Sequence, residues 1–374
     1  MISMSSISNL CLIYRHLCRS HKPFTTLSSV TVNHVLGHNT RHSIVLNRRF
    51  SHSYVNVLKD KQLMTQMEST FILPSVQTIL KRLIGFDDNK VFETRPELIH
   101  KSNEVRFMTD NELKMTLEIA RMKAGEQLAM PPVLAPKEDN PRILATDYEL
   151  QGYIDSKYIF VDSSPGSSDQ TRLIVVRETN GILREANREE RYRMNQMFFP
   201  KEERLMEKPN MFSEPHLTNV LDRREYEFVL NRACLQFEPN DPEYIEICYK
   251  TYDHMVANND VLGLQSTRHF GPFCYYLVYF KKIDELLNQF ILSETIGDAT
   301  DLCQLYYAIH SGDSHLSDEN SINRVEDISL IKKYITEESI ERPILELTLQ
   351  KYEEIQRQKA SLTDDIQRAH GLKT

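Results

Sequence analysis

Rows of apolar residues at helical spacing dominate the chain from about residue 215 to residue 360. Members of each row stand three or four positions apart, which places them on one side of an α-helix. The rows are Ile245, Cys248, Tyr249, Tyr252, Met255 and Val256; Ile283, Leu286, Leu287, Phe290 and Ile291; Leu302, Leu305, Tyr306 and Ile309; Ile328, Ile331 and Ile335; and Leu345, Thr348, Leu349, Tyr352 and Ile355. Because each helix must bury its apolar side, we predict an array of antiparallel helices at 211–360, followed by a charged C-terminal tail at 361–374.

Helix starts in this region are also marked in the sequence. Asp241 followed by Pro242 is typical of a helix cap and a first-turn proline, and Asp298 is expected to cap a later helix. Glycine accounts for 11 of 374 residues, roughly 3% against a usual 7% or so. Few glycines mean few tight turns and few phosphate-binding loops, which again favours helices.

A short segment between 158 and 184 carries the clear β-strand signal. Residues 158–161 and 172–177 are rich in β-branched and aromatic residues, Asn180-Gly181 predicts a tight turn, and 182–184 returns as a hairpin arm. Asn187 followed by Glu190 predicts a helix that ends before Pro200. We expect a small antiparallel β-hairpin sheet plus this helix in a module at 151–210, and an α+β, predominantly α-helical fold overall.

The segment at 51–150 is predicted to hold N-terminal helices and a linker. Residues 51–75 are interpreted as a flexible junction that leads into a helix ending at Gly85. Thr109, with Glu112 three positions later, matches a capping box and predicts the start of a second helix.

The first 59 residues contain no Asp and no Glu but seven Lys and Arg. Ile7, Leu10, Tyr14 and Leu17 recur at helical spacing, with Arg side chains on the other side. Such an acid-free, Ser-rich leader is typical of a mitochondrial presequence, so we predict that 1–50 is removed with cleavage after Phe50. A secretory signal and a disordered basic tail are the alternative interpretations.

The remainder of the chain is acidic. Seven of the 45 Lys and Arg lie in the leader, so 38 remain against 53 Asp and Glu, and the formal charge from Asp60 onward is −15. A protein that depends on phosphate contacts is usually basic, so any contact with nucleic acid should be local. No membrane span is expected, because no apolar run approaches the roughly 18 residues that one requires.

Motifs of catalysis and cofactor binding are missing from the sequence. There is no H-E-x-x-H, G-x-S-x-G, G-x-G-x-x-G or Walker loop, so we expect no catalytic residues, no cofactor, no metal and no small-molecule substrate. Beyond the leader, Cys234, Cys248, Cys274 and Cys303 form no C-x-x-C pair and are predicted to be reduced cysteines of the core.

Basic residues in the helical region are the candidates for contact with rRNA or with a partner. They are Arg223-Arg224, Arg268 in the sequence Thr267-Arg268-His269-Phe270, and Lys281-Lys282. Contact with phosphate at an RNA edge is one interpretation. Surface charge paired with neighbouring acids is the other.

An ordered series of short segments carries a family resemblance over roughly residues 71–360. Among the segments are Met130-Pro131-Pro132-Val133-Leu134, Lys157-Tyr158-Ile159-Phe160, Ile174-Val175-Val176-Arg177-Glu178, Phe199-Pro200-Lys201-Glu202, Gln236-Phe237-Glu238-Pro239, Ser266-Thr267-Arg268, Lys281-Lys282-Ile283-Asp284, Asp298-Ala299-Thr300 and Glu346-Leu347-Thr348-Leu349-Gln350. In this order and spacing they resemble the family of mitochondrial small-subunit ribosomal protein number twenty-two.

The resemblance implies a structural constituent of the mitochondrial small ribosomal subunit, located in the mitochondrial matrix. Its implied partners are other mitochondrial small-subunit ribosomal proteins and, through limited contact, the small-subunit mitochondrial rRNA. A soluble matrix helical-repeat factor for RNA processing or ribosome assembly is the alternative function.

Overall fold

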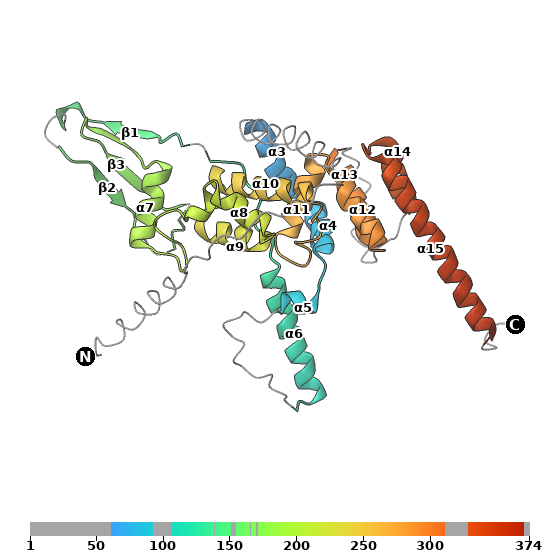
Figure 1. Cartoon of the computed structure of the whole chain (residues 1–374). Coiled ribbons are helices and arrows are strands. Elements are labelled where there is room, and N and C mark those ends of the chain that lie inside the picture. The colour runs from blue at the N-terminus through green and yellow to red at the C-terminus, as the bar shows by residue number, and fades with distance from the viewer. Residues whose placement is uncertain are drawn as a thin grey trace, which may run out of the picture. The chain divides into compact units, whose positions relative to one another are not determined.

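The computed structural model describes residues 61–92, 107–310 and 328–369, apart from positions 138, 151–154, 165 and 170. The predicted presequence and its cleavage site lie outside the described residues. Helices make up most of the described chain, together with one small antiparallel sheet (Figure 1). The predicted fold class, α+β and predominantly α-helical, is confirmed.

The N-terminal helices pack on residues that lie far along the sequence. They are α3 Lys61–Phe71, α4 Pro74–Ile84, α5 Asp88–Val91 and α6 Asp110–Gln127. Gly85, with a φ of 68°, ends α4 as predicted, and the capping box of Thr109 and Glu112 starts α6. The flexible junction predicted at 51–75 is wrong for its second half, because α3 buries Met64 and Met67 in the core, where the Tyr275 hydroxyl donates to the Met67 carbonyl oxygen at 2.8 Å.

Four short strands form the sheet in the order β1-β4-β3-β2, and all neighbours are antiparallel. Their bounds are β1 Ile143–Thr146, β2 Tyr158–Val161, β3 Ile174–Arg177 and β4 Ile182–Glu185. The turn at Asn180-Gly181 joins β3 to β4 as predicted, with Gly181 at a φ of 82°. Strand β1 was not predicted, since Ile143–Thr146 is short and exposed throughout.

Helix α7, Arg188–Phe198, follows the sheet and packs on one of its faces. Ile174 and Val176 of β3 are fully buried there, with Met194 of α7 against them. The predicted helix start is confirmed: Asn187 and Glu190 form a capping box.

The remaining helices build the main core. Their bounds are η3 Asn210–Phe212, α8 His216–Asp222, α9 Tyr226–Gln236, α10 Pro242–Ala257, α11 Phe270–Tyr279, α12 Asp284–Leu292, α13 Ile296–His310, α14 Ile328–Glu337 and α15 Arg342–Ala369. Consecutive helices pack side by side, as α9 does on α10, α12 on α13, and α14 on α15. Helix α11 is buried from Phe270 to Val278 and also contacts α4 and α13.

Details at two helix ends differ from prediction. Asp298 lies inside the first turn of α13, because the Thr295 carbonyl already accepts the N–H groups of Asp298 and Ala299. Helix α15 continues to Ala369, so most of the predicted charged tail is helical.

The free cysteines Cys248, Cys274 and Cys303 are buried in the core as predicted, and Cys234 is half-buried. Within the described ranges, no helix is both long and apolar enough to cross a bilayer.

Candidate functional site

Lys282, one of the predicted contact residues, is held in an ion pair. Its side chain is 10% exposed, and Nζ lies 2.7 Å from Oδ1 of Asp253 on α10. The Tyr276 hydroxyl donates to the same carboxylate oxygen at 2.8 Å, and the Lys282 ammonium lies 5.2 Å from the Tyr276 ring centroid. This pair connects the end of α11 to α10, which favours a structural role for Lys282 over phosphate contact.

Lys281, its neighbour, faces outward. Its side chain is 56% exposed, and Nζ lies 3.6 Å from Oε2 of Glu338, just after α14. The Tyr306 hydroxyl donates to that carboxylate at 2.7 Å, and this hydrogen bond lowers the pKa of Glu338. An exposed ion pair of this kind contributes little, so Lys281 can be drawn away by a stronger anion.

Arg223 and Arg224 follow the end of α8. Arg223 is exposed. Arg224 adopts a φ of 62° that ends the helix, and its guanidinium is 3.9 Å from Oδ2 of Asp260 with the side chain 66% exposed. Both residues are therefore open to a partner.

Arg268 is half-buried and held from within. Its Nε donates to Oδ1 of Asn231 on α9 at 3.0 Å, and Nε2 of the adjacent His269 lies 2.9 Å from the same oxygen. Burial lowers the pKa of His269 to about 3, so this imidazole is neutral at physiological pH. The structure does not bring the predicted basic residues into one site: Arg224, Arg268, Lys281 and Lys282 each contact a different part of the helical core.

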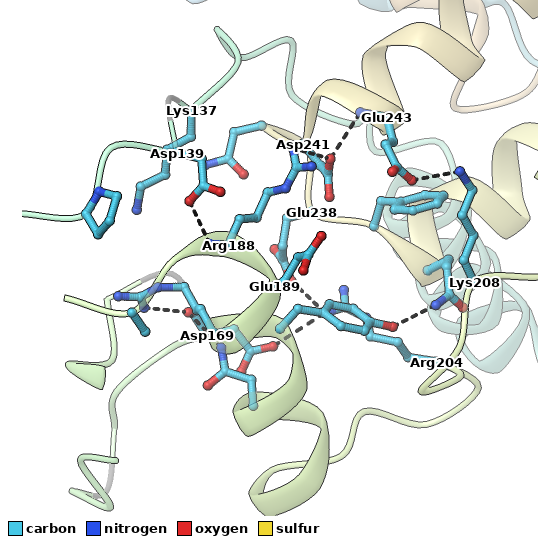
Figure 2. Close-up of a pocket in the computed structure, with 18 of the residues that line it drawn as sticks. Lys137, Asp139, Asp169, Arg188, Glu189, Arg204, Lys208, Glu238, Asp241 and Glu243 are labelled. Carbon is cyan, nitrogen blue, oxygen red and sulfur yellow. Dashed lines mark hydrogen bonds and ion pairs between the residues drawn. The ribbon is translucent and has the colours of Figure 1, made fainter. Parts of the chain in front are cut away.

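A charged cleft of about 350 Å³ lies between the sheet module and the helices, and the sequence analysis did not predict it. Helix α7 forms one wall through Arg188 and Glu189, and the α9–α10 junction forms the other (Figure 2). Seven carboxylates and five cationic side chains line it. The excess of carboxylates makes the cleft unsuitable for a phosphate group.

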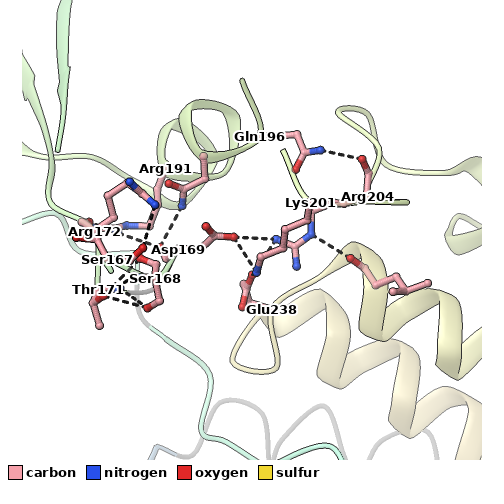
Figure 3. A network of polar contacts seen from close by, with 12 residues as sticks. Ser167, Ser168, Asp169, Thr171, Arg172, Arg191, Gln196, Lys201, Arg204 and Glu238 are labelled. Atoms are coloured by element: carbon pink, nitrogen blue, oxygen red, sulfur yellow. Dashed lines mark hydrogen bonds and ion pairs between the residues drawn. The ribbon is translucent and has the colours of Figure 1, made fainter. Parts of the chain in front are cut away.

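Ion pairs cross the cleft and tie the module to the helices (Figure 3). Arg204 is 6% exposed, and its guanidinium lies 2.8 Å from Oε1 of Glu238 and 3.6 Å from Oδ2 of Asp169. Lys201 joins the same two carboxylates at 2.8 Å from Asp169 and 3.2 Å from Glu238. Because Asp169 precedes β3 and Glu238 follows α9, this four-residue network, which we call the joint, links the two parts of the chain.

Further contacts support the joint. Arg188 at the start of α7 lies 3.2 Å from Asp241, and Lys208 lies 3.0 Å from Glu243. The Gln236 side chain is 1% exposed and exchanges hydrogen bonds with the backbone of Leu205 at 2.8 and 3.1 Å. The cleft therefore separates two packed surfaces, and ion pairs join these surfaces along its length.

A second charge cluster fixes α7 on the sheet. Arg184 of β4 donates two hydrogen bonds to the Glu190 carboxylate, at 2.8 and 3.0 Å, and also pairs with Glu178. The Arg184 hydrogen bonds, reinforced by Lys157 and the Asn187 backbone, lower the pKa of Glu190 to about 2. Glu190 therefore caps α7 and anchors β4 with one carboxylate. The capping motif is visible in the sequence, but the Arg184 contact is not.

The charged side chains of the cleft are largely engaged with one another. In the described part of the chain, no group of three His, Cys, Asp or Glu side chains is placed to hold a metal ion. Most charges of the cleft point at one another rather than at a shared centre (Figure 2). These ion pairs can hold the sheet module against the helical core, and Arg223, Arg224 and Lys281 are exposed outside the cleft.

The sequence matches a known protein family and is similar to two of its mammalian members. The profile of the family described as Mitochondrial 28S ribosomal protein S22 matches residues 69–311. The chain is 36% identical over 285 residues to the mouse (Mus musculus) protein named Small ribosomal subunit protein mS22, covering 76% of this chain and 79% of the relative. It is 37% identical over 290 residues to the bovine (Bos taurus) protein of the same name, with the same coverage.

Proposed function

Because the chain belongs to the mitochondrial 28S ribosomal protein S22 family, we infer that it is a structural constituent of the small subunit of the mitochondrial ribosome. It works in mitochondrial translation, at the mitochondrial ribosome, with ribosomal proteins and rRNA as its partners. The family is one of ribosomal components, and we propose that this member has no enzymatic activity of its own.

We propose more specifically that the protein acts as a rigid scaffold for neighbouring ribosomal proteins. The observation that carries this proposal is the joint: Arg204, 6% exposed between Asp169 and Glu238, fixes the sheet module against the helical core. Charge-assisted contacts of a nearly buried Arg hold geometry better than exposed pairs do. A component that holds its two parts in one geometry can hold its neighbours at a set spacing.

We propose that contact with rRNA is limited and local. The chain from Asp60 onward carries a formal charge of −15, which repels phosphate at long range. Of the predicted contact residues, Arg223, Arg224 and Lys281 combine exposure with weak or no pairing in the described structure. They are the best candidates for phosphate contact, whereas Lys282 belongs to the core.

Sedimentation of mitochondrial lysate through a sucrose gradient, with and without EDTA, tests the ribosomal role. We expect the protein to migrate with the small-subunit rRNA at fixed stoichiometry, and to remain there at high salt because its contacts are mainly with proteins. If most of the protein stayed at the top of the gradient, the assignment would be wrong and the matrix factor for RNA processing or assembly would be favoured.

The scaffold proposal has its own test. Arg204→Met removes the less exposed of the two cations of the joint and leaves Asp169 and Glu238 with Lys201, whose side chain is 47% exposed, so we expect reduced incorporation into the small subunit. Arg357→Met, on an exposed part of α15 with the side chain 72% exposed, is the matched control and should incorporate normally. Equal incorporation of both variants would contradict a scaffold role for the joint.

A further inference from the structure

Helix α6 presents a row of apolar residues that, among the residues the structure describes, is buried at its C-terminal end and half-exposed toward its N-terminal end. Leu113, Leu117, Ala120 and Ala124 follow one another at spacings of four, three and four, the a/d pattern of a coiled coil. Leu113 is 49% exposed and Leu117 51%, whereas Ala124 is 2% exposed. We call this row the α6 seam.

The α6 seam is covered at its C-terminal end. Ala124 is buried, and Leu128, directly after the helix, packs against the main hydrophobic core. The row therefore passes from a buried residue at Ala124 to a half-exposed one at Leu113. The small side chains at Ala120 and Ala124 allow another helix to approach closely where the seam meets the body.

Charges beside the seam have one sign. With Leu113 and Ala120 at d positions and Leu117 and Ala124 at a positions, the flanking e and g positions hold Lys114, Arg121, Lys123 and Thr116. The three cations are exposed, and the described residues provide no ion pair for them. The acids of this helix lie elsewhere: Glu112 forms the capping box, and Glu118 and Glu126 fall at b and c positions, away from the seam.

The packing of α6 leaves apolar surface for a partner. Most of the stability of a helix in a protein comes from tertiary packing of its apolar side, and the 18 residues of α6 have one buried side chain, that of Ala124. Leu113 and Leu117 are about half exposed, so a partner that covers them removes further apolar surface from water.

We propose that the α6 seam is the docking site for an amphipathic helix of a neighbouring ribosomal protein, whose own apolar seam is flanked by Asp and Glu. Leu and Ala side chains offer neither stacking nor hydrogen bonds to a nucleotide, so the seam itself fits protein rather than RNA. The cationic flanks select acidic e and g positions on the partner and set its register. This proposal rests on the inferred ribosomal function, since it takes the partner from the same subunit.

Site-specific photo-cross-linking in assembled small subunits tests the docking site. A benzophenone amino acid replaces Leu117 in the full-length protein, small subunits are isolated from a gradient and irradiated, and the cross-linked products are identified by mass spectrometry. We expect a cross-link to one helical protein segment with acidic residues beside its apolar row. A cross-link to rRNA, a cross-link to a second copy of this chain, or no cross-link from assembled subunits would overturn the proposal. Absence of the protein from the subunit fraction would instead contradict the ribosomal assignment.

Charge reversal supplies a second readout with a matched control. Lys114→Glu, Arg121→Glu and Lys123→Glu together should reduce the cross-linked fraction from position 117 at least tenfold. Glu118→Lys with Glu126→Lys changes charge on the same helix away from the seam, and should leave the yield within twofold. Equal yields from the two variants would show that acidic flanks on the partner are not required, which would overturn the charge pairing.

Discussion

The buried ion pair between Lys282 and Asp253 gives the most direct test of how the fold is held together. Lys282→Met keeps most of the apolar stem against Tyr276 and removes the ammonium. It leaves the Asp253 carboxylate 15% exposed, with Oδ1 hydrogen-bonded to Tyr276 and Oδ2 buried without a hydrogen-bond partner. Removing one partner of a buried pair costs about 3–5 kcal/mol, because the remaining charge stays desolvated. We expect a loss of stability of that size.

Urea unfolding of the purified chain from Asp60 onward, followed by circular dichroism, measures the loss. Lys281→Met is the control next along the sequence: its pair with Glu338 is exposed, so about 0.2–1 kcal/mol is expected. Adding Asp253→Asn to Lys282→Met should recover part of the loss, since the buried charge is removed. If Lys282→Met and Lys281→Met lost equal stability, or if Asp253→Asn recovered nothing, the structural assignment of Lys282 would be refuted. Lys282→Arg, which keeps the charge, provides a folded comparison should Lys282→Met fail to fold.

Three further predictions address other parts of the chain. The pKa of Glu190 is lowered from 4.5 to about 2, so the stabilisation that its carboxylate provides is complete above about pH 4.5 and is lost as the pH falls toward 2. Glu190→Gln should therefore be less stable than wild type at pH 7, and the urea midpoints of the two proteins should converge below pH 4.5. A difference in midpoint that stayed constant with pH would contradict this prediction. Truncation after Pro343 removes the buried Leu345 and Leu349 of α15 and should reduce the amount of protein in the small-subunit fraction of a gradient; normal assembly would show that α15 is dispensable. At Gly271 a Cβ would stand 2.2 Å from Sδ of Met130, so Gly271→Ala should lower the free energy of unfolding by about 1–3 kcal/mol. Adding Met130→Ala should restore most of that loss, measured by thermal unfolding. An unchanged melting temperature in Gly271→Ala would show that the Met130 side chain moves aside at little cost.

Local signals in the sequence predicted those elements whose cause is local. The capping boxes at Thr109 and Asn187, the Asn180-Gly181 turn and the Asp241-Pro242 helix start involve residues within a few positions of one another, and each is found where expected. The apolar rows of α10, α12 and α15 were equally clear, since each helix buries one side only.

Elements fixed by distant contacts were missed or misplaced. Helix α3 owes its place to packing on Tyr275, about two hundred positions later. Helix α11 is apolar on all sides, so periodicity gives no boundary for it. Strand β1 depends on its pairing with β4.

The candidate site shows the same division between local and distant causes. Basic pairs are visible in a sequence, but whether each lysine meets an acid is decided by the fold. Lys281 and Lys282 are adjacent, yet one is 56% exposed and the other 10%. The joint could not be predicted, because Asp169, Lys201 and Glu238 come together only when the sheet module meets the α9–α10 junction.

The contacts of α3 and α4 impose an order on folding. The hydrogen bond between the Met67 carbonyl and Tyr275 cannot form until Tyr275 is present. The ion pair between Arg82 of α4 and Asp301 of α13, 2.8 Å apart in the folded chain, likewise requires Asp301. Any route that delivers the chain from its N-terminus, whether synthesis or threading through a translocation pore, exposes the apolar sides of these helices until residues near 300 have arrived. Closing so long a loop is slow, and exposed apolar helices aggregate in the meantime. We therefore expect the docking of these two helices to be a late step in the formation of the core.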